Sequence, residues 1–252
     1  MTNSPKISAL IITFNEVKHI EAVIKNIDFA DEIIVIDSFS TDGTFEILSK
    51  FENITTIQRA FNNFADQRNF AIEKASHDWI LFIDADERIT PKLENEILSE
   101  INNPQEFVAF MFRRIFFFKQ KRIRFSGFQT DKTYRLFKKG SVQYYDDKIV
   151  HEQPKITGVS KLLKNKMIHY SFDSAAHYKA KMEHYASLKA LELYNKGKKP
   201  HFFHFYVRPL YKFIVNYFLR LGILDGKEGF TLCYLSAYGV YYRYQKLKNL
   251  YN

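Results

Sequence analysis

The chain has 252 residues, of which 46% are hydrophobic, a composition typical of a folded protein with a sizeable core. Its one cysteine, Cys233, excludes an internal disulfide and a zinc site built from several thiolates, so we expect a reducing, cytoplasmic setting. No secretion signal and no run of about 18 apolar residues are evident, so we expect no membrane-spanning helix.

The net charge of +9 comes from the C-terminal part of the chain. Residues 151–252 contain 17 Lys and Arg but 6 Asp and Glu, whereas residues 1–150 contain 20 and 22. This excess of positive charge favours an anionic partner, such as membrane headgroups, a phosphorylated glycolipid or nucleic acid.

The first hundred residues alternate between predicted strands and predicted helices. Short apolar runs predict strands at residues 7–13, 33–36, 54–57 and 79–83. Helical spacing predicts helices at residues 16–27, 44–51, 64–75 and 91–101, the last with Thr90 as N-cap and Pro91 in its first turn. This order predicts an α/β fold with a parallel sheet that is covered by helices on both faces.

The rest of the chain changes in character. The aromatic run at residues 107–118 and the basic residues after it predict a β-hairpin, or alternatively a mobile flap. Helices are predicted at residues 177–193, 205–221 and 230–250, with breaks at 197–200 and 222–229. We therefore predict a first domain at residues 1–170, with halves at 1–100 and 101–170, and a basic, aromatic helical extension at 171–252.

Three polar clusters follow predicted strands, at the edge where parallel sheets bind ligands. They are Thr13-Phe14-Asn15-Glu16, Asp37-Ser38 and Asp84-Ala85-Asp86. In an extended segment residues two apart share a face, so Asp84 and Asp86 would point the same way. Their oxygens suit Mg²⁺ or Mn²⁺, although acidic residues after a strand can equally be solvated loop residues.

Four sequence blocks resemble family 2 glycosyltransferases, enzymes of the GT-A fold that use nucleotide sugars. The blocks are residues 10–16 (LIITFNE), 34–44 (IVIDSFSTDGT), 67–71 (QRNFA) and 82–87 (FIDADE). Later segments resemble the branch of small bacterial enzymes that includes lipopolysaccharide-core β-1,4-glucosyltransferases; they are residues 134–137, 150–152, 168–170, 219–226 and 243–246. The resemblance implies a GT-A mixed sheet with helices on both faces, plus a helical C-terminal extension.

The resemblance also implies roles for individual residues. The nucleotide sugar would be bound by Thr13, Asn15, Glu16, Asp37, Arg68, Asp84 and Ala85. Within this set, Asp37 would contact the uracil ring and Arg68 would lie near the phosphates. Asp86 would bind the metal directly, and Asp84 would orient the donor within the same metal motif. Ser38 departs from the family pattern, which has a second aspartate at this position.

Two roles remain open between candidates. An inverting transfer needs a general base opposite the leaving group, and Glu152 is the first candidate and Asp131 the second. A neutral imidazole could complete the metal site, for which His151 comes before His169, the alternative being ordinary hydrogen bonds at a strand end. Arg135 could touch the acceptor, or pair with Asp131 or another carboxylate.

These observations predict an inverting, metal-dependent glycosyltransferase. It would move a hexose, such as glucose, from a UDP-linked donor to a lipopolysaccharide-core or other cell-surface glycan or glycolipid. One alternative is a nucleotidyltransferase, but the glycine-rich phosphate loop of that class is absent at residues 13–16. Another is a basic membrane-binding or nucleic-acid-binding module without catalysis, although no nucleic-acid motif is recognised, so we expect no nucleic-acid partner.

The C-terminal helices predict a further partner. Residues 201–252 contain 15 aromatic residues with Lys and Arg between them. This pattern predicts peripheral contact with an anionic membrane, at the cytoplasmic face of the inner membrane. The alternatives are packing against the first domain or a homo-oligomer formed through these helices.

Overall fold

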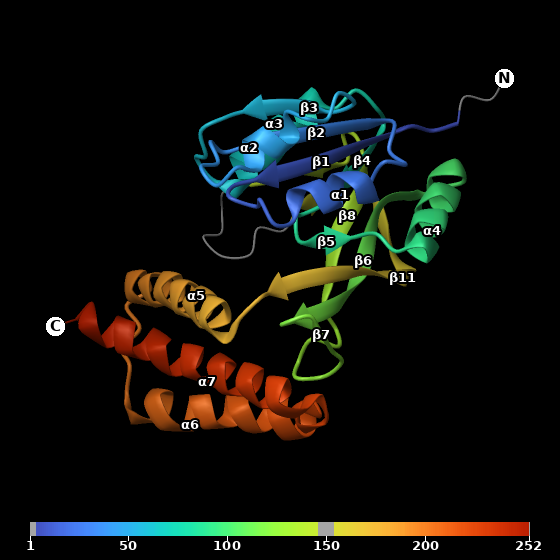
Figure 1. Cartoon of the computed structure of the whole chain (residues 1–252). Coiled ribbons are helices and arrows are strands. Elements are labelled where there is room, and N and C mark those ends of the chain that lie inside the picture. Colours follow the sequence, from blue (N-terminus) through green and yellow to red (C-terminus); the bar gives the residue numbers. More distant parts are fainter. Residues whose placement is uncertain (1–3, 146–153, 252) are drawn as a thin grey trace. The chain divides into compact units, whose positions relative to one another are not determined.

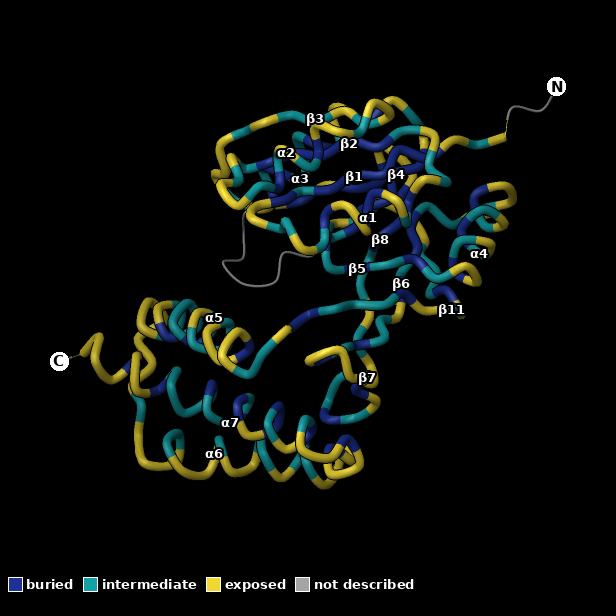
Figure 2. Tube along the Cα trace, in the orientation of Figure 1, coloured by how far each residue is buried: buried dark blue, intermediate teal, exposed yellow. Residues whose placement is uncertain are grey.

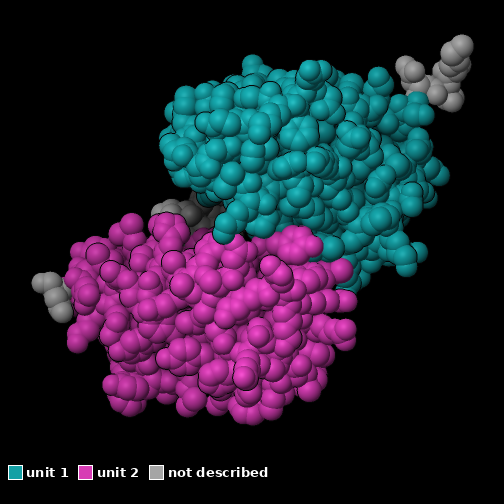
Figure 3. All heavy atoms as spheres, viewed as in Figure 1, with its two compact units in different colours: residues 1–114, 132–169 teal, residues 115–131, 170–252 magenta. Residues whose placement is uncertain are grey.

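The computed structural model describes residues 4–145 and 154–251, which form two compact units (Figures 1 and 3). Unit 1 comprises Met1–Arg114 and Lys132–His169, and unit 2 comprises Ile115–Asp131 and Tyr170–Asn252. The compact units therefore group residues 115–131 with the C-terminal helices. The domain ranges 1–170 and 171–252 stay a prediction.

A mixed sheet forms the centre of unit 1. Four strands are parallel and lie in the order β3-β2-β1-β4: β1 (Ile7–Thr13), β2 (Glu32–Asp37), β3 (Thr55–Gln58) and β4 (Trp79–Phe82). The sheet continues through β8 (Lys132–Lys138), β6 (Phe107–Phe118), β11 (Val159–Phe172) and β5 (Glu87–Arg88). Pairs β4·β8, β6·β8 and β11·β5 are antiparallel, so the sheet is mixed rather than wholly parallel. A separate short ladder pairs β9 (Val142–Gln143) with β10 (Lys155–Ile156).

Helices cover both faces of this sheet, as the fold class predicts. Ala9 and Ile11 face a core shared with α1 (Ile20–Asn26), α2 (Thr44–Leu48) and α4 (Pro91–Asn102). Leu10, between them, faces the opposite core, which is shared with α3 (Phe64–Lys74). This alternation follows from the two-residue period of an extended strand.

The first helix is shorter than its apolar spacing predicts, since α1 begins at Ile20 and not at Glu16. The backbone N–H groups of Asn15, Glu16 and Val17 donate to side-chain oxygens of another loop, those of Ser40, Thr44 and Asp42. These bonds hold residues 15–17 in a loop. The helix start at α4 is confirmed, with the Thr90 hydroxyl accepting from the Leu93 N–H at 3.3 Å.

Unit 2 contains a hairpin and three long helices. Phe116 of β6 pairs with Ile123 of β7 (Lys121–Ile123), which confirms the hairpin. The helical elements are α5 (Ala175–Asn195), α6 (Phe202–Ile214), the π-helical turn η1 (Val215–Leu219), the 3₁₀ turn η2 (Gly222–Asp225) and α7 (Gly226–Asn249). Helix α7 packs against both α5 and α6 (Figure 1). No helix in the described ranges is both long and apolar enough to cross a membrane.

The break before the last helix is shorter than predicted, because α7 already begins at Gly226. A Cβ atom at Gly229 would lie 2.1 Å from the Gly222 carbonyl oxygen, so only glycine permits this close turn. Asp225 fixes the turn to the loop after β7. Its carboxylate accepts from the N–H groups of Arg124 and Phe125 at 2.9 and 3.0 Å.

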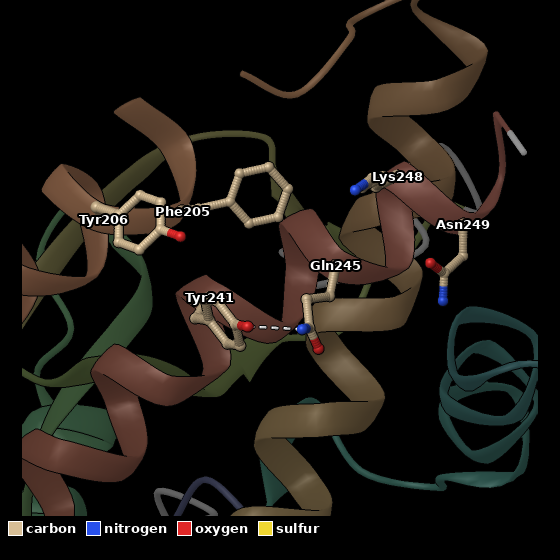
Figure 4. A pocket seen from close by; sticks show the side chains of 6 residues that line it. All are labelled: Phe205, Tyr206, Tyr241, Gln245, Lys248 and Asn249. Carbon is tan, nitrogen blue, oxygen red and sulfur yellow. Dashed lines mark hydrogen bonds between the residues drawn. The ribbon is translucent and has the colours of Figure 1, made fainter. Parts of the chain in front are cut away.

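A groove of about 410 Å³ lies between α6 and α7 (Figure 4). Its lining is aromatic and amide-rich: Phe205, Tyr206, Tyr241, Gln245, Lys248 and Asn249. The Gln245 amide donates to the Tyr241 hydroxyl at 2.6 Å, so part of the polar lining is already satisfied within α7.

Candidate active site

The carboxyl ends of the parallel strands bring the predicted clusters to one edge of the unit 1 sheet. Thr13, at the end of β1, pairs in register with Asp37 of β2. The N–H of Ile83 donates to the Leu10 carbonyl at 3.1 Å, so the chain leaves β4 alongside β1. The sequence prediction that the three clusters share this edge is consistent with the strand order.

Two of the predicted donor-binding residues, Asn15 and Asp37, are linked by hydrogen bonds through Ser40. Asn15 donates its N–H to the Ser40 hydroxyl at 2.9 Å, and its side-chain oxygen accepts from the Thr41 N–H at 2.8 Å. Asp37 is fully buried and accepts from the N–H and the hydroxyl of Ser40 at 3.1 and 2.5 Å. The Asp37 carboxylate therefore holds the turn after β2, which itself borders Asn15.

One buried polar atom at this edge has no protein partner among the described residues. The hydroxyl of Thr13 is buried and has no hydrogen-bond partner among the described residues. A buried hydroxyl without a partner is costly, and a bound ligand would satisfy it. Phe14 and Phe39 flank the cluster with side chains 58% and 52% exposed, and Phe39 has a positive φ of 59°, which is uncommon for a bulky residue.

Asp84 lies between two arginines. It accepts from Arg135 in a very short ion pair, and from Arg68 at 3.2 Å. Burial alone would raise the pKa of this carboxyl, but the charges of Arg135 and Arg68 outweigh that effect and hold the pKa well below its usual range. Asp84 is therefore ionised at neutral pH and can only accept hydrogen bonds.

Glu87 is a buried carboxylate at this edge that the sequence analysis did not single out. It is fully buried, lies 2.7 Å from Arg135 and 3.5 Å from Arg114, and accepts from the Asp84 N–H at 3.2 Å. A buried carboxylate without a partner would be strongly destabilising, so Arg135 is required here. The signal in the sequence was the acidic residue directly after the Asp84-Ala85-Asp86 motif, within a block of the family resemblance.

Asp84 and Asp86 lie in a turn, so the extended segment predicted for them is wrong. The Glu87 N–H donates to the Asp84 carbonyl at 2.9 Å, which closes a turn directly after β4. The buried residue Ala85 holds this turn, because its carbonyl accepts from Arg88 at 2.7 Å. Asp84 pairs with Arg68 and Arg135 and Asp86 with His169, although the charge of His169 also acts on Asp84.

Asp86 lies beside a histidine. Its Oδ2 atom is 3.2 Å from Nε2 of His169, and the two side chains are 23% and 12% exposed. His169 reaches this position because β11 pairs it in register with Glu87 of β5. Two donors bound to one octahedral ion at about 2.1 Å, at right angles, lie about 3 Å apart, so this pair fits Mg²⁺ or Mn²⁺.

The pair is not by itself a complete protein metal site. Within the described ranges, no three acidic, histidine or cysteine side chains come together as a complete set of ligands. Mg²⁺ usually binds through one or two carboxylates and takes its other ligands from water and substrate phosphates. The negative charge of Asp84 is balanced by its two arginines, and the role of Asp86 as the direct metal ligand stays a prediction.

Arg68 lies beside Asp84 of the predicted metal motif. Besides its bond to Asp84, its guanidinium lies over the rings of Phe82 and Tyr144, at 5.1 and 5.4 Å from their centres. These contacts fix the charge in place. Burial raises the pKa of the Tyr144 hydroxyl, which therefore stays neutral beside Arg68.

The remaining predicted residues, Glu16, Asp131, His151 and Glu152, are not among the contacts described so far for Asp84 and Asp86. Glu16 donates its N–H to the Thr44 hydroxyl at 2.9 Å, at the edge of the nucleoside cluster. Asp131 belongs to unit 2, at the turn before β8, where its N–H donates to the Phe128 carbonyl. Glu152 and His151 lie outside the described residues, so their roles as base and metal ligand stay predictions.

Curated relatives similar to this chain carry glycosyltransferase names. An uncharacterized glycosyltransferase of Rickettsia felis is 29% identical, over 96% of this chain and 89% of its own length. The lipopolysaccharide core biosynthesis glycosyltransferase LpsC of Rhizobium meliloti is 25% identical, over 94% of this chain and 93% of its own length.

Solved structures support the fold. The mannosyltransferase PcManGT from Pyrobaculum calidifontis, solved with GDP-Man and Mn²⁺, aligns with a TM-score of 0.58 at 14% identity, over 98% of this chain and 88% of its own. TarS 1-349 of S. aureus, solved with UDP-GlcNAc, aligns with a TM-score of 0.51 at 14% identity, over 98% and 91%. The mixed sheet with helices on both faces is thus the GT-A fold.

The family model described as glycosyl transferase family 2 matches residues 8–163, more than half of the chain. This range contains Asn15 and the strand ends, and the Asp84–Glu87 turn with its partners Arg68 and Arg135. The chain belongs to glycosyl transferase family 2, and it is a glycosyltransferase.

Proposed function

We propose that this glycosyltransferase is inverting and metal-dependent, and that it moves a hexose from a UDP-linked donor to a glycolipid of lipopolysaccharide-core type. The observation that carries the proposal is the Asp84–Glu87 turn, which presents Asp86 beside His169 and Asp84 between Arg68 and Arg135. Similarity to LpsC supports the acceptor class. Similarity to proteins solved with GDP-Man and UDP-GlcNAc supports a nucleotide-sugar donor.

Asp86 and His169 would hold Mg²⁺ or Mn²⁺. When bound, the ion neutralises the negative charge that develops on the diphosphate leaving group. Asp84 stays ionised because of its two arginines, so it can accept hydrogen bonds from hydroxyl groups of the donor sugar. Thr13 and the Asp37–Ser40 turn would contact the nucleoside, with the exposed ring of Phe39 available for stacking on its base.

The acceptor hydroxyl must lose a proton as it attacks the sugar from the side opposite the leaving group. Glu152 remains the first candidate for this base, and Asp131 the second. We also keep the cytoplasmic face of the inner membrane as the predicted location and a homo-oligomer as a predicted assembly.

A thermal-shift screen of the full chain tests the proposal. UDP-glucose, UDP-galactose, UDP-N-acetylglucosamine and GDP-mannose are each added with Mn²⁺, with Mg²⁺ or with a chelator. A donor that binds the native state raises the apparent Tm, and we expect this rise to require metal for at least one UDP-sugar. Asp86→Asn should remove the metal-dependent rise, whereas Asp78→Asn, a change at an exposed carboxylate of unit 1, should keep it. A metal-dependent rise that survives in Asp86→Asn would contradict the assignment.

A further inference from the structure

Exposed apolar surface is concentrated in one short segment of unit 2. Of the 24 large hydrophobic side chains that are exposed in the described chain, 12 lie within residues 202–224. The most exposed are Phe202, Tyr211, Leu219 and Leu224, at 72%, 68%, 73% and 64%. We call the exposed apolar side chains of residues 202–224 the α6 face. An apolar patch of this density marks a contact surface.

Helix α6 turns its apolar side outward. Phe203, Val207, Leu210 and Ile214 recur at helical spacing and are all exposed, and no residue of α6 is buried (Figure 2). A surface helix of a soluble domain normally shows the reverse arrangement.

The other side of α6 contacts α7 through polar and aromatic groups. His204 stacks on Tyr244, with ring centres 4.5 Å apart, and Arg208 donates to the Tyr244 hydroxyl at 2.5 Å. These contacts fix the rotation of the helix about its own axis. The apolar stripe therefore faces outward because the opposite side is already engaged.

The same segment is positively charged and lacks acidic residues. Residues 202–224 contain three Lys and Arg, namely Arg208, Lys212 and Arg220, and no Asp or Glu. Burial and the neighbouring charges of Arg220 and Arg243 lower the pKa of Lys212, so the cations of this region repel one another. An anionic partner would relieve that repulsion.

The exposed apolar surface and the positive charge together favour a lipid surface over a second copy of the chain. A symmetric dimer through the α6 face would place each cation opposite the cations of the second copy, which is unfavourable. A lipid surface matches both properties, because apolar side chains enter the acyl boundary while Lys and Arg extend to the phosphates. Tyr206 and Tyr211 are residues that favour this interface.

We propose that the α6 face binds the surface of an anionic lipid bilayer, with α6 lying in the plane of the interface. The α6 face would then be the surface by which the protein binds the membrane at the location proposed above. It depends only on unit 2, so donor binding and vesicle binding are separate results.

Vesicle flotation of the full chain tests the proposal. The probe is a phosphatidylcholine vesicle with about 30% phosphatidylglycerol, at about 0.15 M salt, compared with phosphatidylcholine alone. We expect the chain to bind the anionic vesicle at least about tenfold more tightly than the phosphatidylcholine vesicle, since each Lys or Arg near the surface adds to the electrostatic attraction. Leu210→Glu combined with Leu219→Glu should weaken binding to the anionic vesicle by a factor of about ten or more relative to the unchanged chain.

A matched variant provides the control. Leu191→Glu with Leu250→Glu introduces the same two charges at exposed leucines of unit 2 outside the α6 face, and should bind vesicles like the unchanged chain. Equal binding by both double variants would overturn the proposal. A second result would also overturn the proposal. The unchanged chain would form a dimer in light scattering and bind no vesicle, and Leu210→Glu with Leu219→Glu would dissociate that dimer. The metal-dependent Tm rise should persist in both variants.

A second measurement reports how deeply the α6 face enters the bilayer. Tyr211→Trp places a reporter on the α6 face, and its emission should shift to the blue and be quenched by brominated lipids. The native Trp79 is buried in unit 1 and supplies a constant background. Tyr251→Trp, at an exposed tyrosine beyond the α6 face, should show neither change. Quenching that is equal at both positions would contradict the assigned surface.

Discussion

Unit 1 and the α6 face handle charge and apolar surface in opposite ways. In unit 1, the charged groups of Glu87 and Arg135 are buried against each other, and the apolar residues form two cores around the sheet. On the α6 face the apolar side chains are exposed, and the charged residues within residues 202–224 are all basic. Buried charges persist where specific partners compensate them, whereas exposed apolar surface persists where an external partner covers it. We therefore assign the reaction to unit 1 and propose the α6 face as the surface that binds a partner.

The strongest test of this contrast is Arg135→Met. Removing one member of the buried pair leaves Glu87 uncompensated, so the free energy of unfolding should fall by about 3–5 kcal/mol. Urea titration followed through Trp79 fluorescence measures it. Lys138→Met, at an exposed residue of the same strand, is the control and should change little. A loss below about 1 kcal/mol for Arg135→Met would mean that charge in unit 1 is not held by specific partners.

The next test asks whether the chemistry is confined to unit 1. Glu152→Gln should lower turnover by at least about 100-fold, equal to about 2.7 kcal/mol, while donor-dependent Tm shifts remain. Asp131→Asn should retain most turnover. If the two outcomes are exchanged, the base comes from unit 2, and the separation of chemistry from docking does not hold.

A smaller, pH-dependent effect is expected at Asp84. Its pKa is lower in the folded chain than in the unfolded chain, so its contribution to stability is fully present above about pH 4 and is lost as pH falls through the folded value. Asp84→Asn should therefore be less stable than the unchanged chain at pH 6, and the difference should shrink towards pH 2.5. A difference that is constant with pH would show that the arginines do not act through charge.

The smallest effect is expected at the α6 face. Leu210→Glu replaces an exposed side chain without contact to a core, so the free energy of unfolding should change by less than about 0.5 kcal/mol. Thermal or urea unfolding without lipid measures this. A loss of several kcal/mol would place Leu210 in the packing of unit 2, and would remove the contrast between the two regions.

Much of unit 1 was predictable from local pattern. The apolar runs of β1, β2 and β4 and the helical spacing of α3 and α4 depend on neighbours in sequence, and the structure confirms them within a few residues. The edge that carries Thr13, Asp37 and Asp84 follows from strand direction alone. Family membership was equally readable, because its blocks are short and contiguous.

Other features depend on contacts between distant residues, and no local pattern contains them. Glu87 and Arg135 are 48 residues apart, and Asp86 and His169 meet only because β5 pairs with β11. A turn at residues 84–87, closed by a hydrogen bond from the Glu87 N–H to the Asp84 carbonyl, takes the place of the expected extended segment.

The amphipathic spacing of α6 was likewise fixed by sequence, but its orientation was not. Periodicity specifies that one side of a helix is apolar, and says nothing about which side meets the protein. Contacts of His204 and Arg208 with Tyr244 decide it, 36 or more residues away along the chain. Sequence thus determined the elements and the chemistry of their side chains, while tertiary structure decided which of those side chains meet each other and which remain exposed.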